Sequence, residues 1–325
     1  MDEAITLQIR DLSTVFETER GTARAVDHVS LDVPHGAVIG IVGESGCGKS
    51  MTARSVMKLL KQGKITGGEI LLEGRDIVPL GEAEMSSVRG EEISMIFQEP
   101  MTSLNPVIPV GKQVQEVVLQ HRRVSREEAK EKVLHVFETV GIPEPEKRYR
   151  AYPHELSGGL RQRVMIAMAM ICRPKLLIAD EPTTALDVTV EAQILRLLRE
   201  LRDTIGTSII LISHDLGVIA EVCDYVYVMY AGEIVEQANV YTLFDRPMHP
   251  YTRGLLGAVR SLRGAEKVLE TIPGTVPDLA SLPEGCRFAP RCERACAACR
   301  ESHPALYGAG GDHFVRCPFG GEEKR

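Results

Sequence analysis

The stretch that most constrains the fold of this chain is Gly43–Ser50, which reads GESGCGKS and fits the pattern G-x-x-x-x-G-K-[ST]. The apolar run before it, Val38–Val42, is typical of a buried parallel strand, and the apolar spacing of Ser50–Leu60 predicts a helix. Glycines in such a turn let backbone N–H groups converge on phosphate oxygens at a helix start, where the dipole favours an anion. The order of strand, turn and helix therefore predicts a phosphate-binding loop in an α/β fold, with Lys49 on the β/γ phosphates and the Ser50 hydroxyl at a Mg²⁺ position.

Length, charge and apolar runs limit the class of protein. The 325 residues suffice for one main domain and an appendage, and the formal net charge of −7 argues against a general nucleic-acid binder, which needs a basic surface. Met1–Ala4 shows no signal-peptide pattern, and the longest apolar run, Val164–Cys172, is too short to span a bilayer. We therefore expect a soluble or peripheral chain made in the cytosol, where its eight cysteines need a role other than disulfides.

Several short strands are predicted around the phosphate loop. Strands over residues 7–10 and 25–33, joined by a polar connection over 17–22, indicate a small antiparallel region. Phe16 lies on or near that region, where its ring could stack on a nucleotide base or pack in the core. Further strands are predicted over 69–72, 93–97 and 208–213, with a hairpin of 224–230 and 233–237 around Ala231-Gly232.

From residue 110 to residue 173 the pattern changes to helices alone, which predicts a helical insertion. Helical spacing covers 111–122, 126–140 and 160–172, and Ser125–Glu128 resembles a capping box. Another amphipathic helix is predicted over 188–204. The segment Leu156–Gly159 precedes the helix at Leu160 and predicts a second anion-binding helix start, by the same dipole and N–H argument.

Polar side chains stand where three predicted strands end. Ligands meet an open α/β sheet at the carboxyl ends of its strands, so Gln98 is a candidate metal or phosphate sensor. Asp180 suits a Mg²⁺-associated carboxylate, and the adjacent Glu181 is placed to orient or deprotonate a water as a general base. His214 ends the next strand and is a candidate for contact with a γ-phosphate.

These segments occur in the order of the nucleotide-binding subunits of ABC transporters, and the chain resembles that family over roughly residues 5–240. The matching segments are GESGCGKS at Gly43–Ser50, Gln98 in FQEP, LSGG at Leu156–Gly159, LLIADE at Leu176–Glu181, ALD at Ala185–Asp187 and His214 in ISHD. The resemblance implies a P-loop NTPase (ABC ATPase) core with an antiparallel β subdomain and a helical subdomain at about 110–173. It also implies a nucleotide-binding domain over 1–255 and a small cysteine-rich C-terminal appendage over 256–325.

The resemblance further implies the roles of single residues. Phe16 would stack on adenine, Glu181, His214 and Gln98 would be catalytic, and Mg²⁺ would be held through Ser50, Gln98 and Asp180. The residues implied to bind ATP are Phe16, Gly43, Ser45, Gly46, Cys47, Gly48, Lys49, Ser50 and Met51.

In that family the LSGG segment contacts the ATP of a second subunit. Here those contacts would come from Ser157, Gly158 and Gly159, so two such domains would enclose two nucleotides and one chain alone would have incomplete sites. Leu160 stands where many family members carry Gln, which puts a side-chain amide contact there in doubt.

Within the family, the sequence of this chain is similar to those of ATPase subunits of oligopeptide and dipeptide importers. The similar segments are MTSLNP at Met101–Pro106, RPKLLIADEPTTALDVTV at Arg173–Val190, HPYT at His249–Thr252, and PGTVPDL and GCRFAPRC in the tail. ATPase subunits of nickel importers share many of these sequence segments, so a nickel importer is one alternative. A non-transport ABC ATPase for DNA repair or iron–sulfur assembly is the alternative from another class of protein. A module that binds ATP without hydrolysing it is disfavoured by the presence of Glu181 and His214.

The peptide-importer resemblance implies a set of partners. They are two transmembrane permease subunits, a second ABC ATPase that is a homologue rather than an identical chain, and indirectly an extracytoplasmic peptide-binding protein; nucleic acid is not among them. The surface near residues 98–122 would dock the membrane partner, so the chain would lie peripherally at the cytoplasmic face of the inner membrane.

Five of the eight cysteines fall in the tail, at Cys286, Cys292, Cys296, Cys299 and Cys317. Their gaps are wider than the usual paired zinc spacing. Tails of peptide-importer ATPases resemble this spacing and can hold a [4Fe–4S] cluster, which implies Cys286, Cys292, Cys299 and Cys317 as its ligands. Zinc and unliganded thiols remain the alternatives.

Cys47 differs from these cysteines because it lies inside the phosphate loop. A helix N-terminus and a nearby lysine such as Lys49 both lower the pKa of a thiol, so we expect a reactive thiol at Cys47. The hypothesis is that alkylation of Cys47 inactivates the protein and that ATP protects it.

Overall fold

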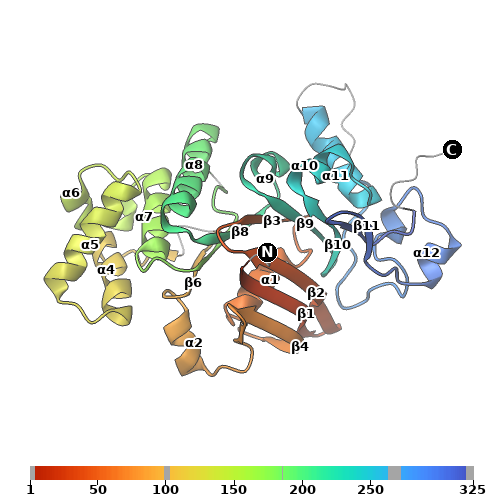
Figure 1. Cartoon of the computed structure of the whole chain (residues 1–325), viewed down its shortest axis with the longest axis horizontal. Coiled ribbons are helices and arrows are strands. Elements are labelled where there is room, and N and C mark those ends of the chain that lie inside the picture. Colours follow the sequence, from red (N-terminus) through yellow and green to blue (C-terminus); the bar gives the residue numbers. More distant parts are fainter. Residues whose placement is uncertain (1–3, 99–102, 185, 263–271, 320–325) are drawn as a thin grey trace. The chain divides into compact units, whose positions relative to one another are not determined.

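The structure, a computed structural model, describes residues 4–98, 103–184, 186–262 and 272–319 (Figure 1). Contacts between residues divide the chain into two units, whose segments alternate along the sequence. The first unit comprises Met1–Thr6, Pro34–Ala37 and Pro79–Ile210. The second comprises Leu7–Val33, Val38–Val78 and Leu211–Arg325. The predicted site residues are consequently divided between two units.

A four-stranded sheet of order β2-β1-β4-β5 lies almost entirely in the second unit. Its strands are β1 (Ile5–Thr18), β2 (Gly21–Pro34), β4 (Gly63–Leu72) and β5 (Arg75–Asp76). The predicted antiparallel region is confirmed, but its strands are longer than predicted. The expected connection over 17–22 is wrong, because only Glu19 and Arg20 separate β1 from β2. Backbone pairing continues through exposed polar residues, where the apolar pattern gives no signal.

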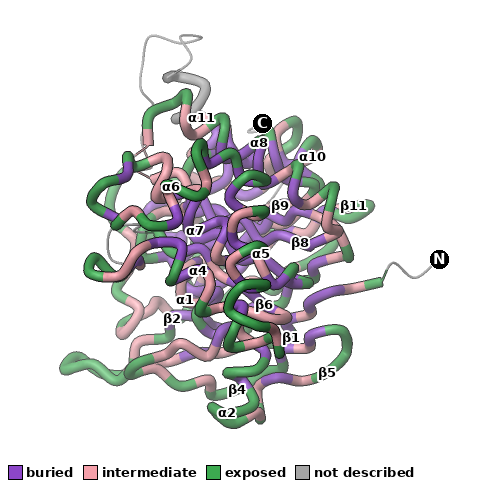
Figure 2. The backbone as a smooth tube through the Cα atoms, turned by 90° about the vertical axis from the view of Figure 1, so that its left-hand side faces the viewer, coloured by how far each residue is buried: buried purple, intermediate pink, exposed green. Residues whose placement is uncertain are grey.

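A second group of strands carries the phosphate loop. All five residues of β3 (Val38–Val42) are buried, and β3 pairs in parallel with β9 (Tyr225–Tyr230), one of the buried strands in Figure 2. The predicted hairpin is confirmed, since β10 (Glu233–Asn239) pairs antiparallel with β9. Its turn, Ala231-Gly232, has φ values of +45° and +90°, the left-handed conformation that a two-residue hairpin turn requires.

The C-terminal tail extends this sheet. β12 (His313–Val315) pairs antiparallel with β10, and β11 (Tyr307–Gly310) pairs with β12. Within the second unit the strand order is therefore β11-β12-β10-β9-β3. The sequence pattern did not predict these two strands, because they are only three and four residues long and β11 holds two glycines.

The helices of the second unit are α1 (Lys49–Val56), α9 (Leu216–Val222), α10 (Val240–Asp245), α11 (Pro250–Leu262) and α12 (Ala297–Glu301), with a 3₁₀ turn η2 at Ala289–Arg291. The helix predicted over 50–60 is confirmed but ends four residues early. Lys58 has a φ of +51°, a left-handed conformation that does not continue an α-helix.

The first unit contains the parallel pair β6 (Ile93–Ile96) and β7 (Leu176–Asp180), in which Ile96 lies opposite Ala179. β8 (Ser208–Ser213) begins in this unit, where the strand order is β8-β7-β6. The first unit also contains the helices α2 (Glu82–Val88) and α8 (Val188–Ile205). The predictions over 93–97, 188–204 and 208–213 are confirmed to within one residue.

The predicted helical insertion is also confirmed in the first unit. It contains α4 (Val110–His121), α5 (Arg126–Thr139), α6 (Pro145–Tyr149), the 3₁₀ turn η1 (Pro153–Glu155) and α7 (Gly158–Met170). The capping box at Ser125 is present, because its hydroxyl accepts the Glu128 N–H at 3.1 Å while the Glu128 carboxylate accepts the Ser125 N–H at 2.7 Å. Buried apolar residues such as Val118 and Phe137 join α4, α5 and α7 into one small core.

Candidate nucleotide site

The phosphate loop joins the buried strand β3 to α1, in the predicted order of strand, turn and helix. Gly43, Gly46 and Gly48 have φ values of +152°, +80° and +112°, which disfavour residues with side chains. A Cβ on Gly43 would stand 2.2 Å from the Met229 oxygen. No side chain caps the start of α1, so its first N–H groups can serve an anion.

Lys49 holds this loop together from inside. The residue is only 5% exposed, and its Nζ donates to the backbone oxygens of Gly43 at 2.7 Å and of Glu44 at 3.0 Å. Ser50 and Met51 follow as the second and third residues of α1. The loop therefore presents backbone N–H groups and a fixed ammonium group on one helix start.

Two predicted catalytic side chains meet in the first unit. Gln98 follows β6 and Glu181 follows β7, and the Gln98 Nε2 donates to the Glu181 Oε2 at 2.9 Å. The Thr184 hydroxyl donates to the same oxygen at 2.9 Å; the apolar and strand-end patterns did not single out Thr184. The strand-end reasoning is confirmed for this pair, because β6 and β7 run in parallel and end together.

The backbone at Glu181 is strained. Its φ is +48°, a left-handed value that costs a residue with a side chain about 1–2 kcal/mol. Such strain concentrates at functional sites. Asp180, the last residue of β7, is 2% exposed, whereas Glu181 is partly exposed and held by two donors. The structure therefore separates a buried carboxylate from an accessible one.

His214 and the LSGG segment occupy different units. His214 directly follows β8 in the second unit and is exposed, and the next residue, Asp215, caps α9 by accepting the Gly217 N–H at 2.6 Å. In the first unit, Ser157 is the N-cap of α7, and its Oγ accepts the Leu160 N–H at 3.4 Å. The helix begins at Gly158, two residues before the predicted Leu160, so both glycines lie in its first turn.

Phe16 lies on β1 opposite Gly63 of β4, as expected for a residue of the antiparallel region. A Cβ on Gly63 would stand 2.6 Å from the Phe16 ring, so the ring rests against β4 and is half-buried. Base stacking by Phe16 stays a prediction. Ala185 of the ALD segment, and Met101 and Thr102 of MTSLNP, lie outside the described residues.

The prediction of a reactive thiol at Cys47 is wrong. Cys47 is 0% exposed, and burial raises the pKa of its thiol by more than the nearby Lys49 lowers it. The Gly232 N–H also donates to the Cys47 oxygen at 2.8 Å, which fixes the backbone here. The burial and the raised pKa of Cys47 therefore do not support the alkylation hypothesis.

Four of the five tail cysteines line a separate cavity of about 380 Å³ in the second unit. Cys286, Cys292, Cys299 and Cys317 line it, as free thiols, together with apolar groups such as Phe288. Burial raises the pKa of Cys286 to about 11 and also raises the pKa values of Cys292 and Cys317. Among the residues that the structure describes, no three His, Cys, Asp or Glu side chains converge closely enough to hold one metal ion.

Cys296 is exposed and does not line this cavity, although its Sγ stands 3.6 Å from the Sγ of Cys299. Gly285 brings two parts of the tail together, because a Cβ there would stand 2.4 Å from the Cys299 oxygen. The Cys286 N–H donates to that same oxygen at 2.7 Å. The backbone segments that carry Cys286 and Cys299 are therefore in direct contact.

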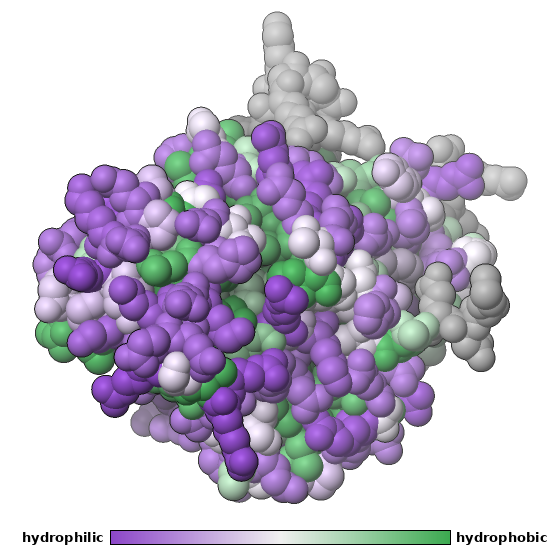
Figure 3. Space-filling model, turned by 60° about the vertical axis from the view of Figure 1, so that its left-hand side comes forward, coloured by the Kyte–Doolittle hydropathy of each residue, from purple (hydrophilic) through white to green (hydrophobic). Residues whose placement is uncertain are grey.

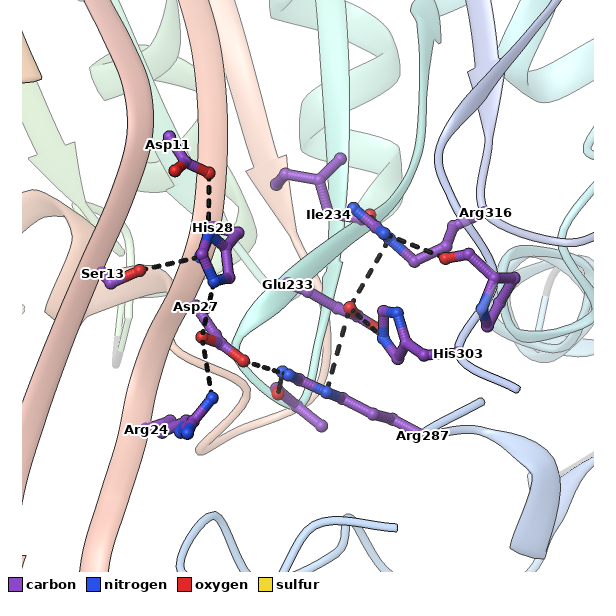
Figure 4. A network of polar contacts seen from close by, with 12 residues as sticks. Asp11, Ser13, Arg24, Asp27, His28, Glu233, Ile234, Arg287, His303 and Arg316 are labelled. Atoms are coloured by element: carbon purple, nitrogen blue, oxygen red, sulfur yellow. Dashed lines mark hydrogen bonds and ion pairs between the residues drawn. The ribbon is translucent and has the colours of Figure 1, made fainter. Parts of the chain in front are cut away.

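A buried polar network anchors the tail to the strands of the second unit (Figure 4). Arg287 donates to Asp27 of β2 and to the Ala231 oxygen at 2.6 Å, and it lies 3.8 Å from Glu233 of β10. His303 and Arg316 reach the same Glu233 carboxylate at 2.8 Å and 3.5 Å. Three side chains of the tail, Arg287, His303 and Arg316, thus meet two buried acids that belong to different sheets, Asp27 of β2 and Glu233 of β10.

Comparisons with known proteins agree with this geometry. Residues 26–184 match the family described as ABC transporter, and residues 235–299 match the oligopeptide/dipeptide transporter C-terminal region. A probable peptide ABC transporter ATP-binding protein of Sinorhizobium fredii is 54% identical over 96% of this chain and 94% of that relative. The oligopeptide transport ATP-binding protein OppD of Bacillus subtilis is 51% identical over 95% of this chain and 87% of that relative.

A solved structure extends the comparison to three dimensions. It is a dimeric, post-hydrolysis state of an ATP-binding cassette bound to ADP and phosphate. The two chains superpose with a TM-score of 0.66 at 25% identity, over 72% of this chain and 98% of that one. Within the described ranges, none of the helices combines the length and apolar character that a membrane crossing requires.

Proposed function

The chain belongs to the family of ABC-transporter ATP-binding proteins, and we propose that it hydrolyses ATP to power the uptake of dipeptides or oligopeptides. The phosphate loop carries this proposal: Gly43, Gly48 and Lys49 build an anion site at the start of α1. The similarity of nearly the whole chain to peptide-transport ATP-binding proteins supports peptide uptake as the process that it powers. We place the nucleotide-binding domain over residues 1–255 and the tail over 256–325.

We propose that the predicted site residues bind and hydrolyse ATP. Lys49 and the loop N–H groups would bind the phosphates, and Ser50, Gln98 and Asp180 would supply oxygen ligands to Mg²⁺, which prefers such donors. Because the Gln98 Nε2 is bound to Glu181, its amide oxygen faces away from that carboxylate and fits this role. Mg²⁺ would neutralise phosphate charge when bound.

Glu181 is the proposed general base in this arrangement. Its carboxylate accepts hydrogen bonds from Gln98 and Thr184, which fix its orientation. The carboxylate would take the proton of the attacking water. His214 would hold the γ-phosphate and this water, and Phe16 would stack on the adenine.

We propose that a second ATPase completes the site. The first turn of α7, at Ser157, Gly158 and Gly159, is exposed or half-buried and presents a helix N-terminus, which suits an anion supplied by another chain. We propose a homologous chain as this partner, so that the ATPase pair is a heterodimer.

The proposed membrane partners are two permease subunits, docked near residues 98–122. Figure 3 brings the side of α4–α7 forward, and most of that surface is hydrophilic with apolar side chains in small separate groups. Val107 and Leu119 are exposed apolar residues in the proposed docking segment. The chain would therefore act at the cytoplasmic face of the inner membrane as a peripheral subunit. It would serve an extracytoplasmic peptide-binding protein only indirectly.

Co-purification from detergent-solubilised membranes tests this function. We expect the tagged chain to bring two integral membrane subunits and a second, non-identical ABC ATPase, and the complex to take up labelled dipeptides or oligopeptides only with ATP. The matched control is the same complex carrying Lys49→Ala, which removes the phosphate-binding ammonium and should abolish uptake. Recovery of DNA or of soluble iron–sulfur assembly factors, without membrane subunits, would contradict the proposal.

We also propose that the tail cavity holds a [4Fe–4S] cluster on Cys286, Cys292, Cys299 and Cys317. Each iron of such a cluster takes one thiolate, which suits four thiols that surround a space. Bound to all four, the cluster would supply the covalent nucleus that this loop-rich segment lacks. Cys296 would stay outside the ligand set.

Protein purified without oxygen should therefore be brown, with broad visible absorption. Cys292→Ser should lose most of this colour, whereas Cys296→Ser is the matched control and should keep it, because its thiol is exposed and outside the cavity. Iron and sulfide analysis measures the content directly. Colourless wild-type protein with one equivalent of zinc would contradict the cluster.

A further inference from the structure

Glu44, the second residue of the phosphate loop, is held from two sides by residues far along the chain. Its backbone N–H donates to the Tyr251 hydroxyl at 2.7 Å. Its carboxylate accepts two hydrogen bonds from the guanidinium of Arg291, at 2.5 Å and 2.9 Å. All three residues belong to the second unit, and 247 positions separate Glu44 from Arg291.

Arg291 is itself fixed in one orientation. Its side chain is 4% exposed, and its Nε donates to the Pro273 oxygen at 2.8 Å. The guanidinium lies 5.8 Å from the centre of the Tyr230 ring and 5.9 Å from that of Phe288. Hydrogen bonding to Glu44 raises the pKa of Arg291 further. A planar fork that serves a carboxylate and a carbonyl at once requires arginine, since lysine offers a single point charge.

Tyr251 is equally constrained. It is 0% exposed at the start of α11, and its ring lies 4.7 Å from Tyr230 and 5.5 Å from Phe288, centre to centre. Phe288 packs edge-on against Tyr230 at 5.3 Å. These three rings, from β9, α11 and the tail, therefore pack together and hold the Tyr251 hydroxyl at the Glu44 N–H.

Glu44 passes this constraint to the lysine of the loop. Its backbone oxygen accepts a hydrogen bond from the Lys49 Nζ at 3.0 Å, so the residue that Tyr251 and Arg291 hold is also a partner of the phosphate-binding ammonium. A displacement of Glu44 would move both that ammonium and the adjoining N–H groups. Misplacement of such groups by about 1 Å is enough to weaken their action strongly.

We propose that Arg291 and Tyr251 are positioning residues of the nucleotide site, which hold Glu44 so that the phosphate loop is set for ATP. The proposal rests on the proposed function, in which this loop binds ATP. It assigns a task in nucleotide binding to two segments beyond the usual motifs, HPYT at His249–Thr252 and GCRFAPRC at Gly285–Cys292.

The test is ATP affinity, measured by titration calorimetry on the purified full-length chain. Arg291→Met should weaken ATP binding about tenfold or more, because the Glu44 carboxylate loses both donors. Arg291→Lys keeps the charge but not the fork and should recover part of the affinity. Arg300→Met removes an exposed arginine of α12 and is the control expected to bind as the wild type does.

A double-mutant cycle with Glu44→Gln separates positioning from general stability. The loss caused by Arg291→Met should shrink to less than about twofold in the Glu44→Gln background, because the ion pair is already gone there. A purely structural role would lower the thermal midpoint and give the same loss in both backgrounds. A loss of ATP affinity that is large in the wild-type background and small in the Glu44→Gln background thus shows that Arg291 acts through Glu44.

Tyr251→Phe provides a variant that keeps the ring and removes only the acceptor of the Glu44 N–H, in case Arg291→Met does not fold. It should weaken ATP binding about fivefold or more. Wild-type affinity in folded Arg291→Met, or in Tyr251→Phe, would overturn the inference while the proposed function stands. Failure of the wild-type chain itself to bind ATP would instead overturn the proposed function.

Discussion

Replacing Glu181 by Gln should lower ATP turnover by about 10²–10⁴-fold and leave ATP binding intact. Gln has the shape of Glu but does not accept a proton from the attacking water at neutral pH. The phosphate loop lies elsewhere in the chain and is unchanged by the substitution. Turnover and affinity should therefore separate, and they can be measured on the same preparation by phosphate release and by calorimetry.

The geometry at Glu181 makes this substitution a clean test. The Oε2 of Glu181 accepts from Gln98 and Thr184, and a Gln oxygen in its place could accept the same two bonds. The left-handed backbone at φ +48° is the same strain for either residue. The variant thus removes the proton-accepting ability of Glu181 and can keep these two hydrogen bonds.

The matched control is Glu138→Gln, an exposed acid near the end of α5. It carries the same change of charge and should hydrolyse ATP at the wild-type rate. If Glu181→Gln also kept wild-type turnover, Glu181 would not be the base, and another group would have to activate the water.

Local patterns predicted the elements that form this site, because its parts are short and follow strand ends. Gln98 and Glu181 are 83 positions apart, yet the rule that parallel strands end at one edge was enough to bring them together. The phosphate loop was predictable for a similar reason, since its glycines, lysine and flanking elements are contiguous.

Contacts between distant segments were not predictable in this way. No local pattern links Glu44 to Arg291, or Asp27 to Arg287, because each pair depends on how the tail folds back onto the sheet. The misprediction at Cys47 has the same origin. Its neighbours in sequence lower the thiol pKa, but the surrounding fold buries it completely, and burial has the larger effect.

Loss of Arg287 should strongly destabilise the second unit. The Arg287 side chain is 8% exposed and pairs with two acids that are 7% and 5% exposed, Asp27 and Glu233. Removing one partner of a buried pair costs about 3–5 kcal/mol, because a charge is left without compensation. Asp27 keeps Arg24 at 3.7 Å, and Glu233 keeps His303 and Arg316, which places Arg287→Met near the lower end, about 3 kcal/mol.

A loss of this size should lower the midpoint of thermal unfolding by about 5–10 °C, measured by calorimetry on the purified chain. The matched control is Arg20→Met, which breaks the pair between Arg20 and Asp278, whose side chains are 84% and 48% exposed. Exposed pairs contribute little, so the midpoint should stay close to that of the wild type.

A second substitution identifies the uncompensated charge as the cause. Adding Asp27→Asn to Arg287→Met should restore part of the lost midpoint, because the buried carboxylate that Arg287 neutralised is then gone. A cavity left by the missing side chain would give no such recovery. A midpoint for Arg287→Met within about 1 °C of the wild type would mean that the tail is not anchored to the sheet through this network.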